Sequence, residues 1–261
     1  MSKAQEPDLH CGPAAVAALF AHRPSDVMRF FYTPMRRQEA GPLCAALAKR
    51  RLPYREVPPE ELQRIAGTVH HGGMVAVARP RGVTLLDASN LPPILWAAPV
   101  LPILDGIGNP HNLGAIARSA AFFGCKALVI SGDQRQARLS DAALRTAEGG
   151  LEALAVFQAP DLPALLSALA PHMLSLAAVA RDGEAPEATP RGRPFALVLG
   201  NEEKGLAQVS IAACAARVTL PGSGAVESLN VSVAAAVLIH ALWHSRSRLE
   251  TLAKTSQSCA C

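Results

Sequence analysis

Six strand-sized apolar runs organise the carboxy-terminal part of the chain, at residues 100–104, 127–131, 154–157, 174–180, 195–199 and 217–220. The segments between them predict helices, and residues 229–244 predict a last one. Strands that are apolar on both faces and alternate with helices are typical of a parallel sheet covered on both sides. Ligands of such sheets bind beyond the carboxyl ends of the strands. The loops after Leu104, Leu199 and Leu220 are therefore the first places to look for a site.

The pattern of residues 13–78 predicts a smaller α/β unit. We expect a helix at 13–22, with Pro13 in its first turn, and strands at 27–32, 54–57 and 74–78. Residues 35–51 predict a helix broken near Gly41 and Pro42. Prolines fill the next segment and indicate a linker. The predicted division is a small domain at 9–79, a linker at 80–98, a larger domain at 99–246 and a flexible polar tail at 247–261.

A glycine-rich turn, DGIGNPHNLG at residues 105–114, joins the first strand of the larger unit to its first helix. The dinucleotide-binding fingerprint requires glycine where His111 stands, and no Gly-Lys-Ser/Thr follows to form a phosphate loop. Taken alone, the segment fits an ordinary strand-to-helix turn equally well, with Pro110 entering the helix.

The helix that follows has two distinct faces. At 100° per residue, the face expected to pack on the sheet carries Leu113, Ile116, Ala117 and Ala120. His111, Gly114 and Arg118 lie on the opposite side. Glycine costs ~1 kcal/mol relative to alanine inside a helix, so Gly114 indicates that another group approaches closely. We expect Arg118 to point into the space that Gly114 leaves.

Composition narrows the class of protein. Half of the 261 residues are apolar, yet no run approaches the ~20 residues of a membrane span. The first residues lack the pattern of a signal peptide, so a cytoplasmic protein is expected. The six cysteines show no zinc-site spacing, and Cys259 with Cys261 cannot complete a site, so no metal is expected. A net charge of +4 is compatible with a polyanionic partner without specifying one.

Three segments, in this order, resemble the signatures of the TrmH-type, or SpoU, branch of the SPOUT RNA methyltransferases. They are NLGAIAR at 112–118, LGNEEKGL at 199–206 and LPGSGAVESLNVSVA at 220–234. The region 10–78, with GTVHHGG at 67–73, resembles the ribosomal-protein-like RNA-binding domain that often precedes this catalytic domain. Together the resemblance covers residues 9–244.

The resemblance implies an α/β fold with a carboxy-terminal trefoil knot, a homodimer formed through the knot region, and S-adenosyl-L-methionine as cofactor. The expected substrate is structured RNA, either tRNA or rRNA, methylated on a ribose 2′-hydroxyl. Periodicity alone would not reveal a knot. By the same resemblance, the cofactor contacts are expected at Val179, Leu199, Gly200, Asn201, Leu220 and Leu229. At Val179 relatives often carry threonine, so the residue type differs there.

The polar signature positions are the expected catalytic residues: Asn112, Arg118, Glu202, Ser228 and Asn230. A guanidinium is a poor base, so Arg118 is expected to orient the acceptor and stabilise charge. Glu202 and Asn230 are expected to hold Arg118 and the knot loops. Ser228 either contacts the substrate or caps the last helix.

One segment departs from the family pattern: RTAEGG at 145–150 replaces the Ser/Ala-Gly-Ala run of well-studied relatives. The departure indicates a less characterised subgroup and leaves the identity of the RNA open. Two alternatives also remain at this point. One is a non-catalytic RNA-binding or ribosome-assembly protein that retains the fold, and the other, weaker one is a nucleotide-dependent oxidoreductase.

Overall fold

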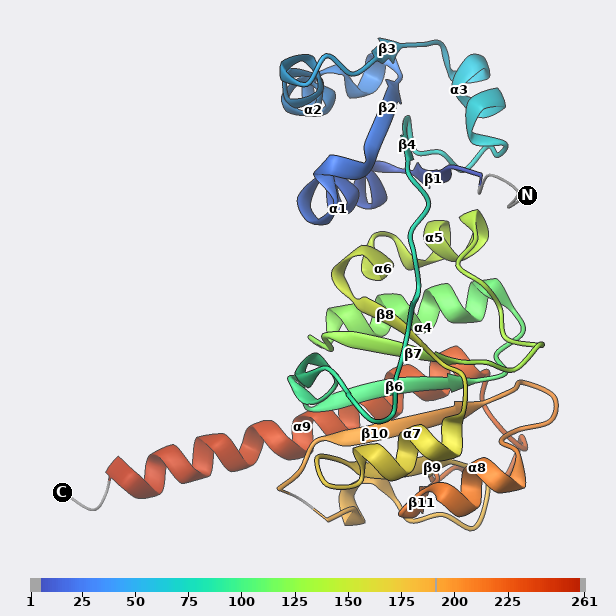
Figure 1. The fold of residues 1–261 in the computed structure, drawn as a ribbon, viewed down its shortest axis with the longest axis vertical. Helices are drawn as coiled ribbons and strands as arrows, with labels where there is room; N and C mark the ends of the chain where they lie inside the picture. Colours follow the sequence, from blue (N-terminus) through green and yellow to red (C-terminus); the bar gives the residue numbers. More distant parts are fainter. Residues whose placement is uncertain (1–5, 191, 259–261) are drawn as a thin grey trace.

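The chain folds into two α/β units that are stacked on each other (Figure 1). The computed structural model describes residues 6–190 and 192–258, with side chains described as far as residue 244. Within these residues no helix is long and apolar enough to cross a membrane.

The smaller unit is a four-stranded sheet in the order β1-β4-β2-β3. β4 runs antiparallel to β1 and β2, whereas β3 is parallel to β2. One face packs on two helices through Leu19, Phe30 and Leu47, and the other packs on a third helix through Leu62 and Val75. In chain order the elements are β1 (Asp8–Cys11), α1 (Pro13–His22), η1 (Pro24–Asp26), β2 (Val27–Tyr32), η2 (Pro34–Arg36), α2 (Arg37–Lys49), β3 (Tyr54–Glu56), α3 (Pro59–Ala66) and β4 (Met74–Ala78).

The predicted break in the second helix is wrong, because α2 continues through Gly41 and Pro42. Proline removes one backbone donor and strains the preceding turn, but it does not by itself end a helix that tertiary packing holds. Here Ala40, Cys44 and Leu47 bury one face of α2 on both sides of the proline.

The larger unit is a seven-stranded sheet in the order β11-β9-β10-β6-β7-β8-β5, and every pairing in it is parallel, as the apolar runs predict. Its strands are β5 (Thr84–Leu85), β6 (Val100–Asp105), β7 (Ala127–Ser131), β8 (Ala155–Ala159), β9 (Leu174–Ala178), β10 (Phe195–Gly200) and β11 (Ala216–Val218). Its helices are η3 (Pro93–Trp96), α4 (Pro110–Phe122), α5 (Asp141–Ala147), α6 (Gly150–Ala153), α7 (Leu162–Leu169), η4 (Pro186–Ala188), α8 (Gln208–Ala213) and α9 (Val231–Ser258).

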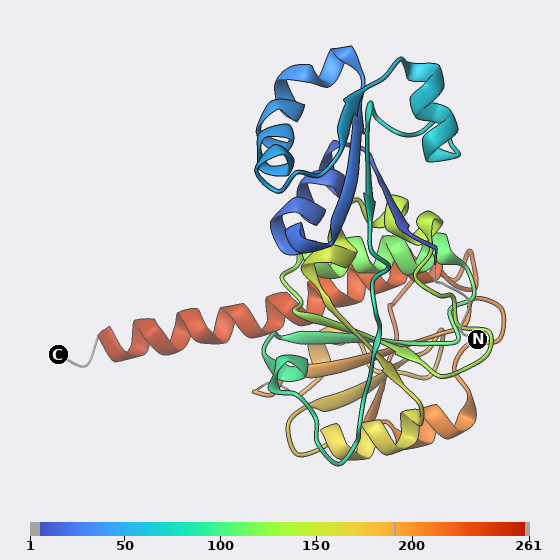
Figure 2. The ribbon, with the colours of Figure 1, turned by 45° about the horizontal axis from the view of Figure 1, so that its top comes forward.

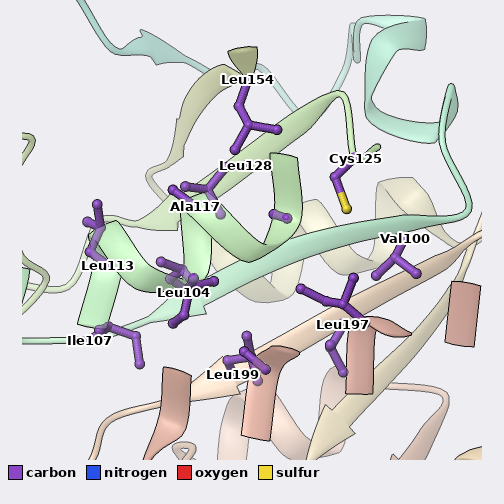
Figure 3. Close-up of a cluster of buried hydrophobic side chains, with 14 of the residues drawn as sticks. Val100, Leu104, Ile107, Leu113, Ala117, Cys125, Leu128, Leu154, Leu197 and Leu199 are labelled. Carbon is purple, nitrogen blue, oxygen red and sulfur yellow. The ribbon is translucent and has the colours of Figure 1, made fainter. Parts of the chain in front are cut away.

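Each face of this sheet has its own core, which explains why the strands are apolar throughout. On one face Leu104, Leu128 and Leu197 pack beneath α4 and α9 (Figure 3). On the other face alternate strand residues such as Ile103 and Val198 pack against α7, α8 and η3. Figure 2 shows α5 and α6 above α4, between the sheet and the smaller unit.

The structure adds detail to the expected linker, and the last helix differs from its prediction. The expected linker contains β5, which pairs with β8, and Leu95, which is buried in the second core, so this connection is packed. The last helix was expected to end near His244, but the backbone of α9 remains helical to Ser258. Polar composition predicted a tail there, yet the segment contains no glycine or proline to stop a helix. Residues 259–261 of the predicted tail lie outside the described residues.

Candidate functional site

The turn between β6 and α4 is fixed from both sides. Gly106 has a φ of 76°, which glycine adopts without strain, and Asn109 caps α4 by accepting a hydrogen bond from the His111 N–H at 2.9 Å. Gln136, which is buried, accepts from the Ile107 N–H at 3.1 Å and donates to the Ile107 carbonyl at 3.2 Å. This glutamine clamp was missed from the sequence, since no signature includes it.

Glu202, in the loop after β10, receives three hydrogen bonds from the start of α4. The Asn112 side-chain amide donates at 2.7 Å, and the backbone N–H groups of Gly108 and Asn109 donate at 3.3 and 3.4 Å. Partial burial works to raise the pKa of Glu202, but the hydrogen bonds from Asn112 and from backbone N–H groups outweigh it and lower the pKa. A carboxylate that remains charged thus sits at the positive end of a helix.

Asn112 also joins this cluster to α9. Its Oδ1 accepts a hydrogen bond from the side-chain amide of Asn230 at 3.2 Å. The Oδ1 of Asn230 in turn accepts from the N–H and hydroxyl of Ser232, at 2.9 and 2.6 Å, and so caps α9. Three signatures that lie far apart in the sequence therefore meet through Glu202, Asn112 and Asn230.

The loop after β10 is closed by Asn201. Its amide donates to the Gly106 carbonyl at 2.7 Å, and its Oδ1 accepts from the N–H groups of Glu203 and Lys204 at 3.1 Å. A Cβ added at Gly200 would lie 2.5 Å from the Gly205 carbonyl carbon. The close approach that requires glycine here comes from the chain's own turn, where a cofactor was expected.

Arg118 does not join the Glu202 cluster, contrary to the expectation that Glu202 and Asn230 hold it. Its guanidinium lies 2.8 Å from the Glu148 carboxylate, and both side chains are about half exposed. The space beside Gly114 is also filled, since a Cβ there would lie 2.5 Å from the Ala143 carbonyl oxygen of α5. Gly114 therefore serves helix packing, and Arg118 points outward beside α5.

Ser228 lies in the exposed segment 221–230 and makes no hydrogen bond in the described structure. Because Asn230 caps α9, Ser228 does not, and its hydroxyl is free to meet a substrate. Within the described residues 220–229 one hydrogen bond forms, from the Ala225 N–H to the Ser223 hydroxyl at 3.4 Å. The other backbone N–H and C=O groups of this loop are available to a ligand.

The expected cofactor residues lie on neighbouring loops at the carboxyl edge of the sheet. β9, β10 and β11 are adjacent, and the loops after them carry Val179, Asn201 and Leu220. The Val179 N–H donates to the Val218 carbonyl at 3.0 Å, while the Thr219 hydroxyl donates to the Val179 carbonyl at 3.1 Å. The Leu199 side chain is buried and Leu229 is half exposed. The backbone groups of Val179 and Asn201 are thus paired within the chain, and the unpaired backbone groups that could read an adenine edge lie in the loop 220–229. In the described residues no cluster of three His, Cys, Asp or Glu is arranged to hold a metal ion.

A groove on the smaller unit is a second candidate surface. It is lined by Arg29, Phe31, Pro53, Tyr54 and Arg55. The Arg55 guanidinium lies 5.9 Å from the centre of the Phe31 ring, and Tyr54 is 42% exposed. The groove combines cations with aromatic rings and has no acidic residue in its lining. Sequence reasoning missed it because these residues come together only across β2 and β3.

Two family models match this chain. The SpoU rRNA Methylase family matches residues 99–240, and a family described as RNA 2′-O ribose methyltransferase substrate binding matches residues 10–82. The solved structures that resemble it include the AdoMet-bound rRNA methyltransferase from Sinorhizobium meliloti, with a TM-score of 0.75 and 18% identity over 91% of this chain and 87% of that one. Another is an RNA 2′-O ribose methyltransferase with a TM-score of 0.72 and 25% identity over 92% and 89%.

Curated relatives point to the same family. The 23S rRNA (guanosine-2′-O-)-methyltransferase RlmB of Yersinia pestis is 32% identical, over 87% of this chain and 93% of that protein. RlmB of Ralstonia nicotianae is 31% identical over 95% and 98%. The chain spans only 44% of an uncharacterized tRNA/rRNA methyltransferase of Haemophilus influenzae to which it is 35% identical. With a family match across most of the larger unit, and with the two RlmB proteins matched along nearly their whole length, this chain belongs to the SpoU rRNA methylase family.

Proposed function

We propose that this protein transfers a methyl group from S-adenosyl-L-methionine to a ribose 2′-hydroxyl of rRNA or tRNA. The observation that carries the proposal is the hydrogen-bonded chain Glu202–Asn112–Asn230. It draws three signature loops together at the carboxyl edge of a parallel sheet, in a member of a methylase family. The relatives named as guanosine-2′-O-methyltransferases of 23S rRNA support rRNA and the ribose oxygen.

The backbone around six residues would hold the cofactor: Val179, Leu199, Gly200, Asn201, Leu220 and Leu229. S-adenosyl-L-methionine supplies an electrophilic methyl group on a sulfonium. The protein has to align the acceptor oxygen with that methyl group, let the hydroxyl proton leave and balance the changing charge. Glu202 and Asn230 serve this task indirectly, because they fix Asn112 and the loops that shape the site.

Arg118 and Ser228 would meet the RNA directly. The cationic guanidinium of Arg118 can orient the acceptor ribose through an adjacent phosphate and stabilise negative charge on the oxygen. Glu148 contacts Arg118 at Nη2, and because the guanidinium is about half exposed, its other N–H groups remain open to a phosphate while Glu148 stays in place. The free hydroxyl of Ser228 can donate a hydrogen bond to the ribose or phosphate.

The smaller unit, as an RNA-binding domain at residues 9–79, would hold the RNA outside the catalytic domain at 99–246. Its groove suits an unpaired nucleobase: Tyr54 offers a stacking face and Arg29 offers charge for a flanking phosphate, while Arg55 is paired with Glu61. Recognition of this kind selects loops and bulges in structured RNA over uninterrupted helix.

We also propose a homodimer formed through α9. One side of this helix packs on the sheet through Leu238 and Leu242, while Val233 and Val237 on another side are 49% and 43% exposed. An apolar helix face without a partner in the single chain fits an interface. The trefoil knot and a cytoplasmic location, where rRNA and tRNA are modified, stay predictions that follow from the family.

Two measurements test the proposed function. Calorimetry should detect S-adenosyl-L-methionine binding to the purified protein. Mapping of 2′-O-methyl sites should show one or more sites in rRNA or tRNA of the parent strain that are lost on deletion of the gene. Protein that binds no S-adenosyl-L-methionine and labels no cellular RNA would refute the proposal. Full rescue of the lost site by an Arg118→Ala variant would refute the role of Arg118, and rescue of growth without the site would favour a non-catalytic RNA-binding protein.

A further inference from the structure

A fully buried carboxylate, that of Glu152 in α6, joins the two units. Arg23 donates two hydrogen bonds to it, from Nε at 2.7 Å and from Nη2 at 3.0 Å, and the Arg81 guanidinium lies 3.3 Å away. Arg23 follows α1 of the smaller unit and Arg81 follows β4. A carboxylate is stable away from water only when such partners satisfy it. The pairing of Glu152 therefore depends on the docking of the smaller unit.

Hydrogen bonds on both sides hold the connection between the two units in place. Arg81 donates its backbone N–H to Asp8 at 2.7 Å, and Arg79 donates its own to the Asp26 carbonyl at 2.9 Å. The Arg81 guanidinium also donates to the carbonyls of Leu151 and Leu154. Because β5 begins three residues later, at Thr84, the smaller unit is fastened directly to the larger sheet.

Two glycines let the segment after α5 fit between helices of both units. A Cβ at Gly149 would lie 2.5 Å from the Ala18 Cβ in α1, and its φ of 92° also favours glycine. A Cβ at Gly150 would lie 2.8 Å from the Arg118 Cα in α4. This segment is therefore pressed on one side by the smaller unit and on the other by the helix that carries Arg118.

The same segment holds the polar side chains of α4. Glu148 pairs with Arg118 at 2.8 Å, and the Thr146 hydroxyl lies 2.9 Å from Nδ1 of His111. Residues 146–152 thus contact Arg118 at one end and the arginines of the smaller unit at the other. Residues 146–150 of this segment belong to the stretch 145–150 in which the sequence departs from the family pattern.

We propose that residues 146–152 form a coupling segment, through which docking of the smaller unit fixes the position of Arg118. Glu152 and Glu148 are positioning residues: the first anchors the segment to Arg23, and the second directs the guanidinium. The groove on the smaller unit and Arg118 in the larger unit then lie at a constant separation. An RNA element bound in the groove would therefore determine which nucleotide reaches Arg118. This inference rests on the role proposed for Arg118.

The first test measures backbone hydrogen exchange in Glu152→Gln and Arg23→Gln, two variants that remove opposite partners of the same pair. We expect exchange at least tenfold faster in α1, in α6 and in α4 around residues 114–118. The control is Arg37→Gln, which breaks a bidentate arginine–glutamate pair within the smaller unit, to Glu56 at 2.7 Å. The control should leave exchange in α4 unchanged.

The second test separates positioning from folding. In both interface variants we expect kcat for RNA methylation to fall at least fivefold per folded molecule, with S-adenosyl-L-methionine affinity unchanged within twofold. Glu148→Gln should lower kcat without faster exchange in α1. Faster exchange confined to α1, with α4 and kcat unchanged, would overturn the coupling. If the wild-type protein methylates no RNA, the proposed function fails, and the exchange in α4 still decides whether the units are coupled.

Discussion

Asn112 uses both ends of its side-chain amide, and this makes it the centre of the site. It donates to Glu202 and accepts from Asn230, and it is only 9% exposed. An aspartate in its place would offer only acceptors and would set a second negative charge against Glu202. The residue type is thus required by two partners that lie about 90 and 120 residues further along the chain.

The buried imidazole of His10 predicts how the stability of the protein depends on pH. Burial lowers the pKa of His10 to about 4; Glu152 opposes this shift, and Arg23 and Arg81 add to it. The unfolded chain binds the proton near pH 6.5, so it holds more protons than the folded chain between about pH 6.5 and 4. The free energy of unfolding should therefore fall by about 3 kcal/mol as the pH is lowered from 6.5 to 4.

Urea unfolding at several pH values checks this prediction. His10→Gln should flatten the dependence between pH 6.5 and 4, whereas His22→Gln, at the exposed end of α1, should retain that of the wild type. Equal slopes for His10→Gln and the wild type would contradict the prediction.

Tyr54 provides a residue-scale test of RNA recognition. Removal of one stacking ring typically costs ~1–3 kcal/mol of binding, so Tyr54→Ala should weaken binding of an RNA hairpin with an unpaired loop by roughly 5- to 150-fold. Tyr54→Phe keeps the ring and should bind like the wild type. A fluorescence titration measures both. Equal affinities for the alanine and phenylalanine variants would exclude stacking on Tyr54.

At the scale of elements, α4 is the helix around which the larger unit is organised. Its apolar face, with Leu113, Ile116 and Ala117, packs toward the sheet as its periodicity predicts. Its polar face is covered in part by α5 and α6. The sequence of α4 alone does not reveal this contact. The cap by Asn109 and the hydrogen bonds to Glu202 fix its first turn.

Gly114→Ala should destabilise the protein. The new Cβ would lie 2.5 Å from the Ala143 carbonyl oxygen and 2.8 Å from the Thr146 Cβ, so α4 and α5 would have to separate. Overpacking typically costs ~1–3 kcal/mol, against a gain of up to ~1 kcal/mol in helix propensity. A lower free energy of unfolding in urea is expected. Gly82→Ala, with no atom within 4 Å of the new Cβ, is the control and should change little. A stabilised Gly114→Ala variant would contradict the tight α4–α5 contact.

At the scale of the whole molecule, the two units and α9 define how RNA and a second chain would approach. The smaller unit lies against α5 and α6, whereas the outer part of α9 projects from the sheet (Figure 1). The groove proposed to bind RNA lies on the smaller unit, and the α9 face proposed to meet a second copy lies on the larger unit.

Val237→Glu tests the proposed dimer. A charge on the exposed apolar face of α9 should be tolerated by the monomer and should shift the protein from dimer to monomer, with at least a tenfold weaker association. Light scattering after size-exclusion chromatography measures the mass. Val209→Glu, at a 63% exposed valine of α8, is the matched control and should leave the dimer intact. A monomeric wild-type protein at micromolar concentration would refute the dimer itself.

The sequence by itself was sufficient for the parallel sheet, and it singled out Asn112, Glu202 and Asn230, which the structure joins by hydrogen bonds. Both depend on short-range sequence patterns: the strands on apolar runs of strand length, and the polar residues on signature segments that are continuous in the sequence. It also indicated the loops after β6, β10 and β11 as the places to look for a site, because ligands of parallel sheets bind beyond the carboxyl ends of the strands.

Only the tertiary structure decided the partners of those residues. Gly114 faces α5, Gly200 faces its own turn, and Arg118 pairs with Glu148 rather than with the Glu202 cluster. The residues around Glu152 do not indicate its partner, because Arg23 lies more than a hundred residues away in the chain. A local pattern determines which face of an element is apolar, but the group that meets a polar side chain depends on how whole elements pack, and packing is set by all of them together.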